Sequence, residues 1–384
     1  MNQENKVIII CDNHHNGLNI ARSFGSQNIF PYGIIICKDI KECYINESKY
    51  WEKTLIIDSY NQLIDTLVDN FADSELKPVV ITCSDTAGEI IDLNYDKLKD
   101  CFILPSICGK QGEIFRLMDK EYQTEFAQNY NIPTAKTWVL KPATYKNILS
   151  DIIFPCIVKP VSSYEGVKAD IKKCNNKDEL NQYLKIIFKE KNYTRILVQE
   201  FLEFDYEIEF VGSYSARTNS YLISKTHRGW PIVGGTNSFF SIINDKNINL
   251  MVERILDVFK EIKFNGLFDI EMFNINGDIY LNEINWRNTG NSFFSLGTDV
   301  HYAVVWYYAM INKENTTLKR YCTDVNQFAM NEATDLRHCV FGKYSFWKWN
   351  ADRARTNSFA LWYSKDLKPT FIRYVQLLKK LVKK

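Results

Sequence analysis

Four polar residues around position 280 have the types and spacing of a magnesium and nucleotide site. An Asn-Gly turn signal at 276–277 joins a strand that carries Glu271 to a second strand that carries Glu283, Asn285 and Arg287. Alternate residues of a strand share one face, so these last three should point the same way, and Glu271 can join them across the hairpin. Carboxylate and amide oxygens suit Mg2+, and an Arg suits a phosphoryl or carboxylate group. A solvated surface ion-pair network is the competing interpretation.

Two lysines could neutralise the oxygens of a polyphosphate. Lys120 follows Asp119 at the start of a helical pattern, and Lys159 lies at the end of a buried apolar strand within 155–160. A charge inside such a strand is costly unless it has a partner. Together with the acidic hairpin, the two lysines outline a site for ATP and magnesium.

The first 105 residues alternate strands with helices. Apolar runs predict strands at 7–10, 34–37, 54–57 and 78–82, with helices near 61–71 and 86–99. This order predicts a doubly wound parallel sheet. Ligands of such sheets bind at the loops that follow the strands, and here these loops carry residues 12–17 and the pair Ser84-Asp85.

The first of these loops contains the pair His14-His15. Adjacent side chains diverge, and no carboxylate or cysteine completes a metal-ligand spacing. A loop that faces a substrate and plain solvation are the interpretations that stay open.

After Pro105 the pattern becomes that of an α+β body. Helices are expected at 113–130, 177–190 and 247–262, and strands at 155–160, 195–199, 206–213, 220–225, 266–274 and 278–285. The tail beyond residue 301 is aromatic-rich and ends in a basic amphipathic helix at 372–384. We expect this helix to pack one face on its own protein, with a role at a membrane surface or toward a partner as the less favoured alternative.

Composition limits the classes of function. A chain of 384 residues should form two or three domains, and its 47 basic and 46 acidic residues leave no global field that points to nucleic acid or a membrane surface as a partner. The ten cysteines show no CxxC spacing, which predicts reduced thiols. Since we find no basic leader and no apolar segment of the roughly 20 residues that span a bilayer, we expect a cytoplasmic protein.

In the order of its motifs the sequence resembles the ATP-grasp superfamily, over roughly residues 106 to 300. The segments that carry the resemblance are Arg-Leu-Met-Asp-Lys at 116–120, Asn-Ile-Pro at 131–133, Pro-Cys-Ile-Val-Lys-Pro at 155–160, Leu-Val-Gln-Glu-Phe-Leu at 197–202, Glu-Ile-Glu at 207–209 and Asn-Glu-Ile-Asn-Trp-Arg at 282–287. The pattern is most similar to the D-aspartate ligase and predicted carboligase branch, with carbamoyl-phosphate synthetases and biotin carboxylases as relatives.

The resemblance implies an α/β plus α+β fold with three parts. Residues 1–105 would form an N-terminal Rossmann-like domain of the type that precedes ATP-grasp domains. Residues 106–310 would form the ATP-grasp domain, with a small lid subdomain at about 135–202 and a larger one at about 203–310. Residues 311–384 would form the C-terminal aromatic-rich extension.

The resemblance also assigns roles to individual residues. It implies that Lys120 and Lys159 contact the α and β phosphates and that Glu207 holds the ribose hydroxyls. The residues implied along the adenine are Gln199, Glu200 and Leu202. The loop after Lys159 contains one glycine, Gly166, where relatives are often glycine-rich, so the hydroxyls of Ser162 and Ser163 would supplement its backbone amides.

On the metal side, the resemblance implies that Glu271, Glu283 and Asn285 hold Mg2+, with Mn2+ as an alternative ion. Arg287 would face the transferred phosphoryl group or the acceptor carboxylate, and Arg228 would be a basic substrate residue. Trp286 stands where Pro is common in relatives, and it should face the core because it alternates with its neighbours.

The implied activity is that of an ADP-forming ligase that joins a carboxylate to an amine through an acyl phosphate. Small-molecule acids and amines, amino acids among them, would be the partners, and a homodimer stays open. Such chemistry needs charge neutralisation and positioning rather than a protein nucleophile. A biotin-type carboxylase that acts with a separate carrier is one alternative, and a non-catalytic nucleotide-binding sensor is another.

Overall fold

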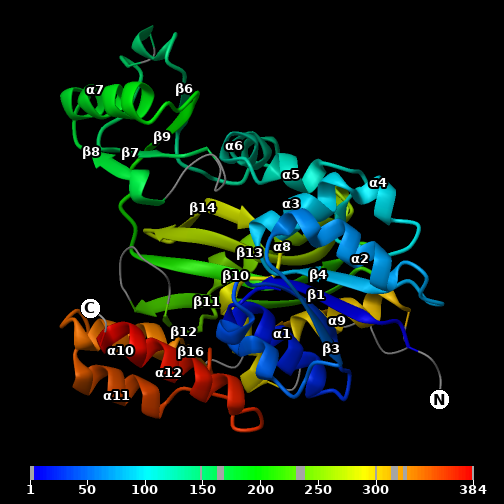
Figure 1. Cartoon of the computed structure of the whole chain (residues 1–384). Helices are drawn as coiled ribbons and strands as arrows, with labels where there is room; N and C mark the ends of the chain where they lie inside the picture. The colour runs from blue at the N-terminus through cyan, green and yellow to red at the C-terminus, as the bar shows by residue number, and fades with distance from the viewer. Residues whose placement is uncertain are drawn as a thin grey trace. The chain divides into compact units, whose positions relative to one another are not determined.

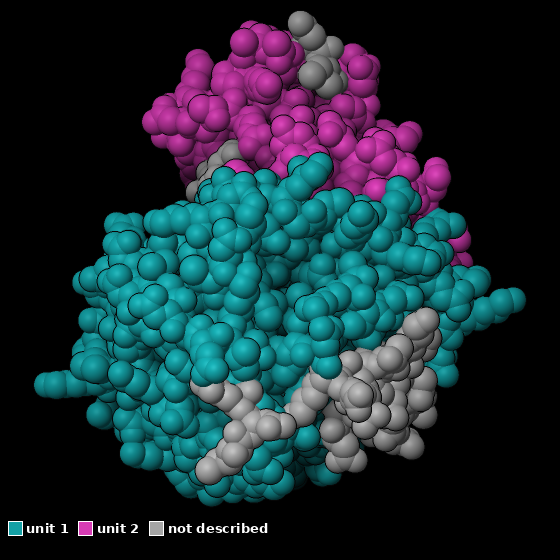
Figure 2. Space-filling view, turned by 90° about the vertical axis from the view of Figure 1, so that its right-hand side faces the viewer, with its two compact units in different colours: residues 1–114, 208–269, 285–384 teal, residues 115–207, 270–284 magenta. Residues whose placement is uncertain are grey.

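The computed structural model describes residues 4–147, 149–161, 168–230, 238–298, 301–312, 319–322 and 327–382 (Figure 1). The chain forms two compact units, coloured separately in Figure 2. Unit 1 comprises residues 1–114, 208–269 and 285–384, and unit 2 comprises residues 115–207 and 270–284. Each unit is built from discontinuous stretches, and the domain boundaries expected from the sequence stay a prediction.

A parallel sheet of four strands organises the first part of unit 1. Its order is β3-β2-β1-β4, with bounds Lys53–Ile57, Tyr32–Ile36, Val7–Asp12 and Val79–Thr82. Apolar side chains of β1 alternate between two cores. One core contains Ile9 and helix α1 (His15–Gly25), and the other contains Ile8 with helices α2 (Leu63–Phe71) and α3 (Asp85–Leu93). Helices therefore cover both faces, as expected for a doubly wound sheet.

A larger, mostly antiparallel sheet follows in the order β14-β13-β10-β11-β12-β16-β17. The bounds in that order are Asp278–Asn285, Phe264–Ile275, Tyr206–Ser215, Ser220–Trp230, Phe239–Ile242, Phe328–Met330 and Ser358–Phe359. Two short strands pair at its side, β5 (Ser106–Ile107) with β13 and β15 (Lys319–Cys322) with β11. Helix α8 (Lys246–Glu261) lies between β12 and β13 in the chain.

The turn between β13 and β14 has the predicted Asn-Gly geometry. Asn276 has a φ of 52° and Gly277 a φ of 92°, so both central residues adopt the left-handed conformation that a type I′ hairpin turn requires. The predicted hairpin is therefore present. Beyond its second strand, Trp286 is only 2% exposed and packs its ring against Phe259 and Phe264, as the alternation predicted.

Unit 2 contains a small sheet in the order β6-β9-β7-β8, with bounds Thr137–Leu140, Ile196–Glu200, Cys156–Lys159 and Lys172–Cys174. Helix α7 (Lys177–Lys185) and the π-helical turn Ile186–Glu190 supply its apolar cover, in which Leu180 and Leu184 pack against Val158. The helix expected at 113–130 is two helices, α5 (Glu113–Leu117) and α6 (Lys120–Asn129). The break occurs because extended Asp119 caps α6 by accepting the N–H of Glu121 at 2.8 Å.

The C-terminal extension is an integral part of unit 1. Its helices, in orange to red in Figure 1, are α10 (Glu332–Val340), α11 (Phe346–Ala354) and α12 (Lys368–Val382), and α9 (Tyr302–Met310) precedes them. The fully buried Arg22 of α1 donates to Asp366 at 3.0 Å, and Glu332 accepts the backbone N–H groups of residues 360–362. Among the described residues, no helix is both long and apolar enough to cross a membrane.

Replacing Trp286 with Ala should destabilise unit 1, because the change leaves a cavity beside Phe259 and Phe264. We expect a loss of about 3–5 kcal/mol in the free energy of unfolding, measured by urea denaturation. Trp347→Ala is the matched control, since that side chain is 81% exposed and its loss should cost under about 0.5 kcal/mol. Equal losses in the two variants would contradict the packing described here.

Candidate functional site

In unit 2, cationic and acidic side chains from distant parts of the chain meet. Lys120, the first residue of α6, donates from Nζ to Oε1 of Glu283 on β14 at 2.9 Å. The two residues are 163 positions apart in the sequence. The structure thus brings one of the two predicted phosphate-binding lysines to one of the predicted metal ligands.

The second lysine, Lys159, is an almost buried ammonium at the end of β7, with 8% of its surface exposed. Within the described part of the chain its side chain has no hydrogen bond or ion pair. Burial, followed by the positive charge of Lys120, lowers its pKa to about 8, while Glu283 and Glu271 act in the opposite direction. A buried cation in this state favours the arrival of an anion, because the anion would restore the stabilisation that water no longer gives.

Both lysines line one polar cavity within unit 2. The side chains that surround it are those of Lys120, Gln123, Thr124, Thr134, Lys159, Gln199, Leu281 and Asn282. Gln199, predicted to lie along the adenine, is therefore on the same cavity as the two lysines, and its amide donates to Thr137 at 3.0 Å. Three of the predicted nucleotide-binding residues converge on one cavity.

Five lining residues were not among the predicted site residues, and two of these, Gln123 and Asn282, make hydrogen bonds that order the cavity wall. Gln123 is 4% exposed, donates to the backbone oxygen of Ile284 at 2.7 Å and accepts its N–H at 3.0 Å, which fixes α6 against β14. Asn282 donates to Oε2 of Glu271 at 3.1 Å. The only sequence signal for Asn282 was its place at the head of the Asn-Glu-Ile-Asn motif. Gln123 gave none, because its partner is backbone of a distant strand.

The other described residues that were predicted to contact the nucleotide lie at or after the end of β9. Glu200 is its last residue and accepts the backbone N–H of Lys136 at 3.4 Å, and Leu202 follows on the connection to β10. Glu207 lies on β10 and is partly exposed. Ser162 and Ser163 lie outside the described residues.

The acidic pair of unit 2 fits magnesium in its chemistry. Glu271 and Glu283 offer hard carboxylate oxygens, and both are partly exposed. Within the described ranges, no three His, Cys, Asp or Glu side chains gather as a metal cluster. Two carboxylates and an amide are what Mg2+ takes when substrate phosphates complete its shell, whereas a structural zinc site needs four protein ligands.

In unit 1, Arg287 is joined to the loop that follows β4. Its Nε donates to Oδ1 of Asp85 at 2.6 Å, and its Nη2 donates to Oδ1 of Asn285 at 3.2 Å. Asp85 begins α3, after Ser84, which caps that helix. The predicted phosphoryl or carboxylate contact is thus held next to one of the two predicted ligand loops.

The other predicted loop lies against the same place. Tyr60 donates to Asp12 at 2.9 Å and lies 2.7 Å from the hydroxyl of Ser84, so it links the ends of β1 and β4. His14 caps α1 by accepting the N–H of Asn16 at 3.3 Å. Reduced hydration of its ring, and then the positive charges of Arg373 and Arg287, lower the pKa of His14 to about 4. The loop therefore presents a neutral imidazole.

Two further residues singled out from the sequence, His15 and Arg228, lie in unit 1. His15 is buried, and its neighbour Asn16 donates to the carbonyl of Cys83 at 2.7 Å, so this part of the loop is structural. Arg228 lies on β11 beside a register shift in its pairing with β12. Its role as a substrate residue stays a prediction.

Comparisons with known proteins identify the class. Residues 125–298 match the ATP-grasp domain family. The chain therefore carries an ATP-grasp domain, and the predictions of the superfamily, of the fold class and of an ATP-grasp enzyme are confirmed.

Solved structures of the same fold are distant in sequence. N5-carboxyaminoimidazole synthetase of Staphylococcus aureus is 14% identical, with a TM-score of 0.65 over 88% of this chain and 86% of that chain. The biotin carboxylase domain of 2-oxoglutarate carboxylase from Hydrogenobacter thermophilus is 14% identical, with a TM-score of 0.64 over 84% and 72%. L-amino acid ligase from Bacillus licheniformis is 13% identical, with a TM-score of 0.60 over 80% and 75%. No curated protein sequence matches the chain.

Nucleotide binding should be coupled to proton uptake by Lys159. Its pKa is about 8 without a ligand and should rise toward the usual 10.5 beside phosphate oxygens. Affinity for Mg-ADP should then fall by up to about tenfold per pH unit above pH 8, because the protein must first regain the proton. Titration calorimetry at pH 8.5, in two buffers of different ionisation enthalpy, should show net proton uptake.

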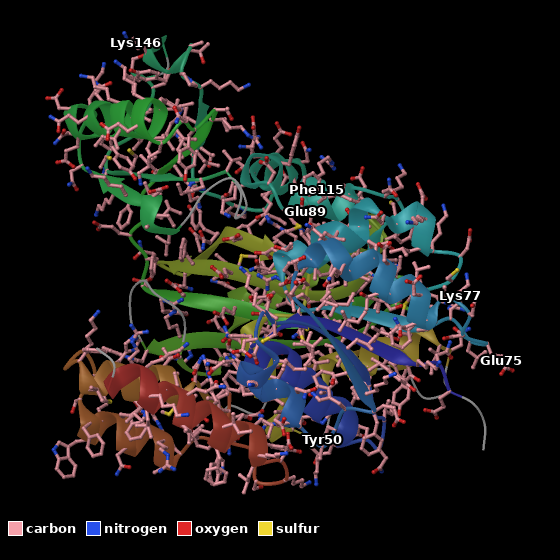
Figure 3. All side chains as sticks on the ribbon, in the orientation of Figure 1. Tyr50, Glu75, Lys77, Glu89, Phe115 and Lys146 are labelled. Carbon is pink, nitrogen blue, oxygen red and sulfur yellow. The ribbon has the colours of Figure 1, made fainter. Side chains whose placement is uncertain are left out.

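The variant Lys159→Arg keeps a positive charge that does not titrate in this range, so it should bind without that uptake. Lys146→Ala is the matched control, since Lys146 is an exposed lysine of unit 2 (Figure 3) and its loss should leave the uptake unchanged. Unchanged proton uptake in Lys159→Arg would show that another group titrates.

Proposed function

We propose that the protein is an ATP- and Mg2+-dependent, ADP-forming ligase that joins a small carboxylate to an amine through an acyl phosphate. The observation that carries this proposal is the buried ammonium of Lys159, on a cavity shared with Lys120 and close enough to Glu271 and Glu283 to be influenced by both. Two cations beside two carboxylates suit a triphosphate bound with a divalent ion by their charge, while the cavity itself, at about 10 Å3, is the size of a water molecule.

In this proposal the residues predicted from the sequence bind the nucleotide and its metal ion. Lys120 and Lys159 neutralise phosphate oxygens, and Gln199, Glu200, Leu202 and Glu207 surround the adenosine. Glu271, Glu283 and Asn285 would hold Mg2+, or Mn2+ in its place, and such an ion would offset charge on the transferred phosphoryl group. Lys120 would exchange its present partner, Glu283, for a phosphate oxygen when the carboxylate turns to the metal.

The acceptor acid would be positioned by unit 1. A carboxylate oxygen of the acid attacks the γ-phosphorus and ADP leaves, and the amine then attacks the acyl carbon and phosphate leaves. The first step brings the acceptor carboxylate to the γ-phosphate, which is also an anion. It therefore depends on groups that neutralise the carboxylate and orient it, and Arg287 and Arg228 are the candidates. Asp85 now occupies the guanidinium of Arg287 much as a substrate carboxylate would.

Similar folds support a nucleotide-dependent ligase without specifying its substrates. One is the Hydrogenobacter carboxylase domain, in complex with MgADP and bicarbonate, and another is the Bacillus L-amino acid ligase. We place the present protein in the cytoplasm, in agreement with the nine described cysteines, all of which are free thiols.

The test is incubation of the purified protein with ATP, Mg2+ and a panel of amino acids and other small acids and amines. We expect acceptor-dependent release of ADP and phosphate together with a new amide. Release of AMP and pyrophosphate would contradict the acyl-phosphate route. Turnover that requires bicarbonate and biotin would identify a carboxylase, and tight ATP binding without turnover on any acceptor would identify a sensor.

Glu283→Gln should lower turnover by roughly 100-fold or more while the fold persists, because it removes a charged metal ligand and almost no volume. Steady-state ADP release and the melting temperature measure the two effects. Glu75→Gln, on an exposed loop of unit 1 (Figure 3), is the control and should keep full turnover. Full activity in Glu283→Gln would exclude the metal assignment.

His14→Gln should change the acceptor rather than the nucleotide side of the reaction. His14 lies on the same loop as Asp12 and near Arg287, so we expect a several-fold rise in the acceptor KM with the KM for ATP within about twofold. Initial rates at varied acceptor and at varied ATP separate the two constants. A rise in the KM for ATP alone would place this loop on the nucleotide side.

A further inference from the structure

The last part of the chain carries a strong excess of positive charge. Residues 336–384 contain twelve Lys and Arg residues and only two acidic ones, while the whole chain has 47 basic and 46 acidic residues. The rest of the protein is therefore acidic. The two acids of this stretch, Asp352 and Asp366, are each 4% exposed and are bonded to Arg355 and Arg22. The charge that this stretch shows to solvent is almost entirely positive.

Helix α12 carries apolar side chains on two sides, and on the inner side Ile372 and Tyr374 pack against the core of unit 1. The side of the helix that faces unit 1 is rich in polar contacts: Thr370 donates to the carbonyl of Leu361, Tyr374 donates to Glu332, and Gln376 donates to the carbonyl of Glu42 at 3.0 Å. The opposite side presents Phe371, Val375 and Leu378, which are 55%, 50% and 61% exposed. At spacings of four and three residues they form one row along the helix.

We call this row, together with Trp362, the outer stripe. Trp362 is 42% exposed and meets the ring of Phe371 edge-on, with ring centroids 6.5 Å apart. The exposed Lys379 and Lys380 follow the stripe along α12. Elsewhere on the extension, α10 and α11 expose further large apolar side chains, namely Leu336, Val340, Phe341, Phe346 and Trp347.

A partner that binds the outer stripe must match both its apolar side chains and the positive charge beside them. Three kinds of partner can be compared on these two requirements. A second copy of the chain would bring Lys379 and Lys380 toward another basic surface, which like-charge repulsion opposes. A nucleic acid would match the charge and could stack on Trp362, but Val375 and Leu378 offer nothing to a base. An anionic lipid surface satisfies both requirements, since apolar side chains enter the boundary of the acyl chains while lysines meet the headgroups.

We propose that the outer stripe docks the protein on the surface of an anionic lipid bilayer. The site is peripheral, so the protein lies on the membrane and does not cross it. This inference is independent of the ligase proposal, because no residue of the outer stripe belongs to the nucleotide or acceptor groups. It goes beyond the expectation from the sequence that α12 packs one face on its own protein, since a row of large apolar side chains on the other face is exposed.

The test is co-sedimentation of the full chain with lipid vesicles. We expect binding to phosphatidylcholine vesicles that contain about 30% phosphatidylserine, and much weaker binding to pure phosphatidylcholine. About 0.5 M NaCl should weaken the interaction by screening. The variant F371S/V375S/L378S should lose about tenfold in affinity, and K379Q/K380Q should lose several-fold.

The control variant L93S/L250S replaces two leucines of unit 1 that are 41% and 54% exposed and lie outside the extension. It should bind vesicles like the natural chain, and melting temperatures should show that every variant is folded. The proposal is overturned if phosphatidylserine vesicles do not sediment the protein, or if F371S/V375S/L378S binds them unchanged. It is also overturned if sedimentation velocity shows a dimer that this variant converts to a monomer, because the stripe then belongs to a second copy.

Discussion

The interaction on which the rest of the site depends is the burial of the Lys159 ammonium at the end of β7. Removing such a group from water disfavours its charged form, and a second cation, Lys120, adds to the cost. Glu283 does not cancel both charges, because it is bonded to Lys120 and acts on Lys159 only at longer range. Among the described residues of unit 2, the direct contact of Glu283 therefore compensates Lys120 and leaves Lys159 without an ion pair. A polyphosphate would bind favourably here, because its oxygens can contact both ammonium groups at once and offset the free-energy cost of burying them.

The residues that suit a nucleotide and the residue that suits an acceptor acid lie on different elements of the fold. Groups suited to a nucleotide lie on the small sheet, on α6 and on the hairpin of unit 2, whereas Arg287 lies in unit 1, tied to Asp85 at the carboxyl end of a parallel sheet. Strand β14 carries Glu283 and ends at Asn285, and Arg287 lies in a bend two residues beyond the strand. The strand repeat of two residues relates the two proposed metal ligands Glu283 and Asn285, while the chain beyond the strand supplies Arg287, the proposed acceptor contact.

The sequence predicted those features that local rules determine. Asn276 and Gly277 specified a type I′ turn, Asp119 capped the helix that presents Lys120, and the alternation along β14 placed Trp286 in the core. It did not predict Gln123 or Tyr60, because their partners are a strand backbone 161 residues away and two loops from separate strands. The sequence predicted that α12 packs one face on its own protein, as it does, but not which face that is. An amphipathic pattern shows that a helix has two sides, but the buried side is decided by the polar partners that Tyr374 and Gln376 find on distant segments.

The most direct measurement of the central claim is a crystal structure with Mg2+ and a non-hydrolysable ATP analogue. The account predicts the triphosphate in the cavity of unit 2, with Nζ of both Lys159 and Lys120 about 2.7–3.2 Å from phosphate oxygens and with Glu283 released from Lys120 to the metal. A triphosphate bound elsewhere, with Lys159 still lacking an anionic partner and Lys120 still bonded to Glu283, would contradict it.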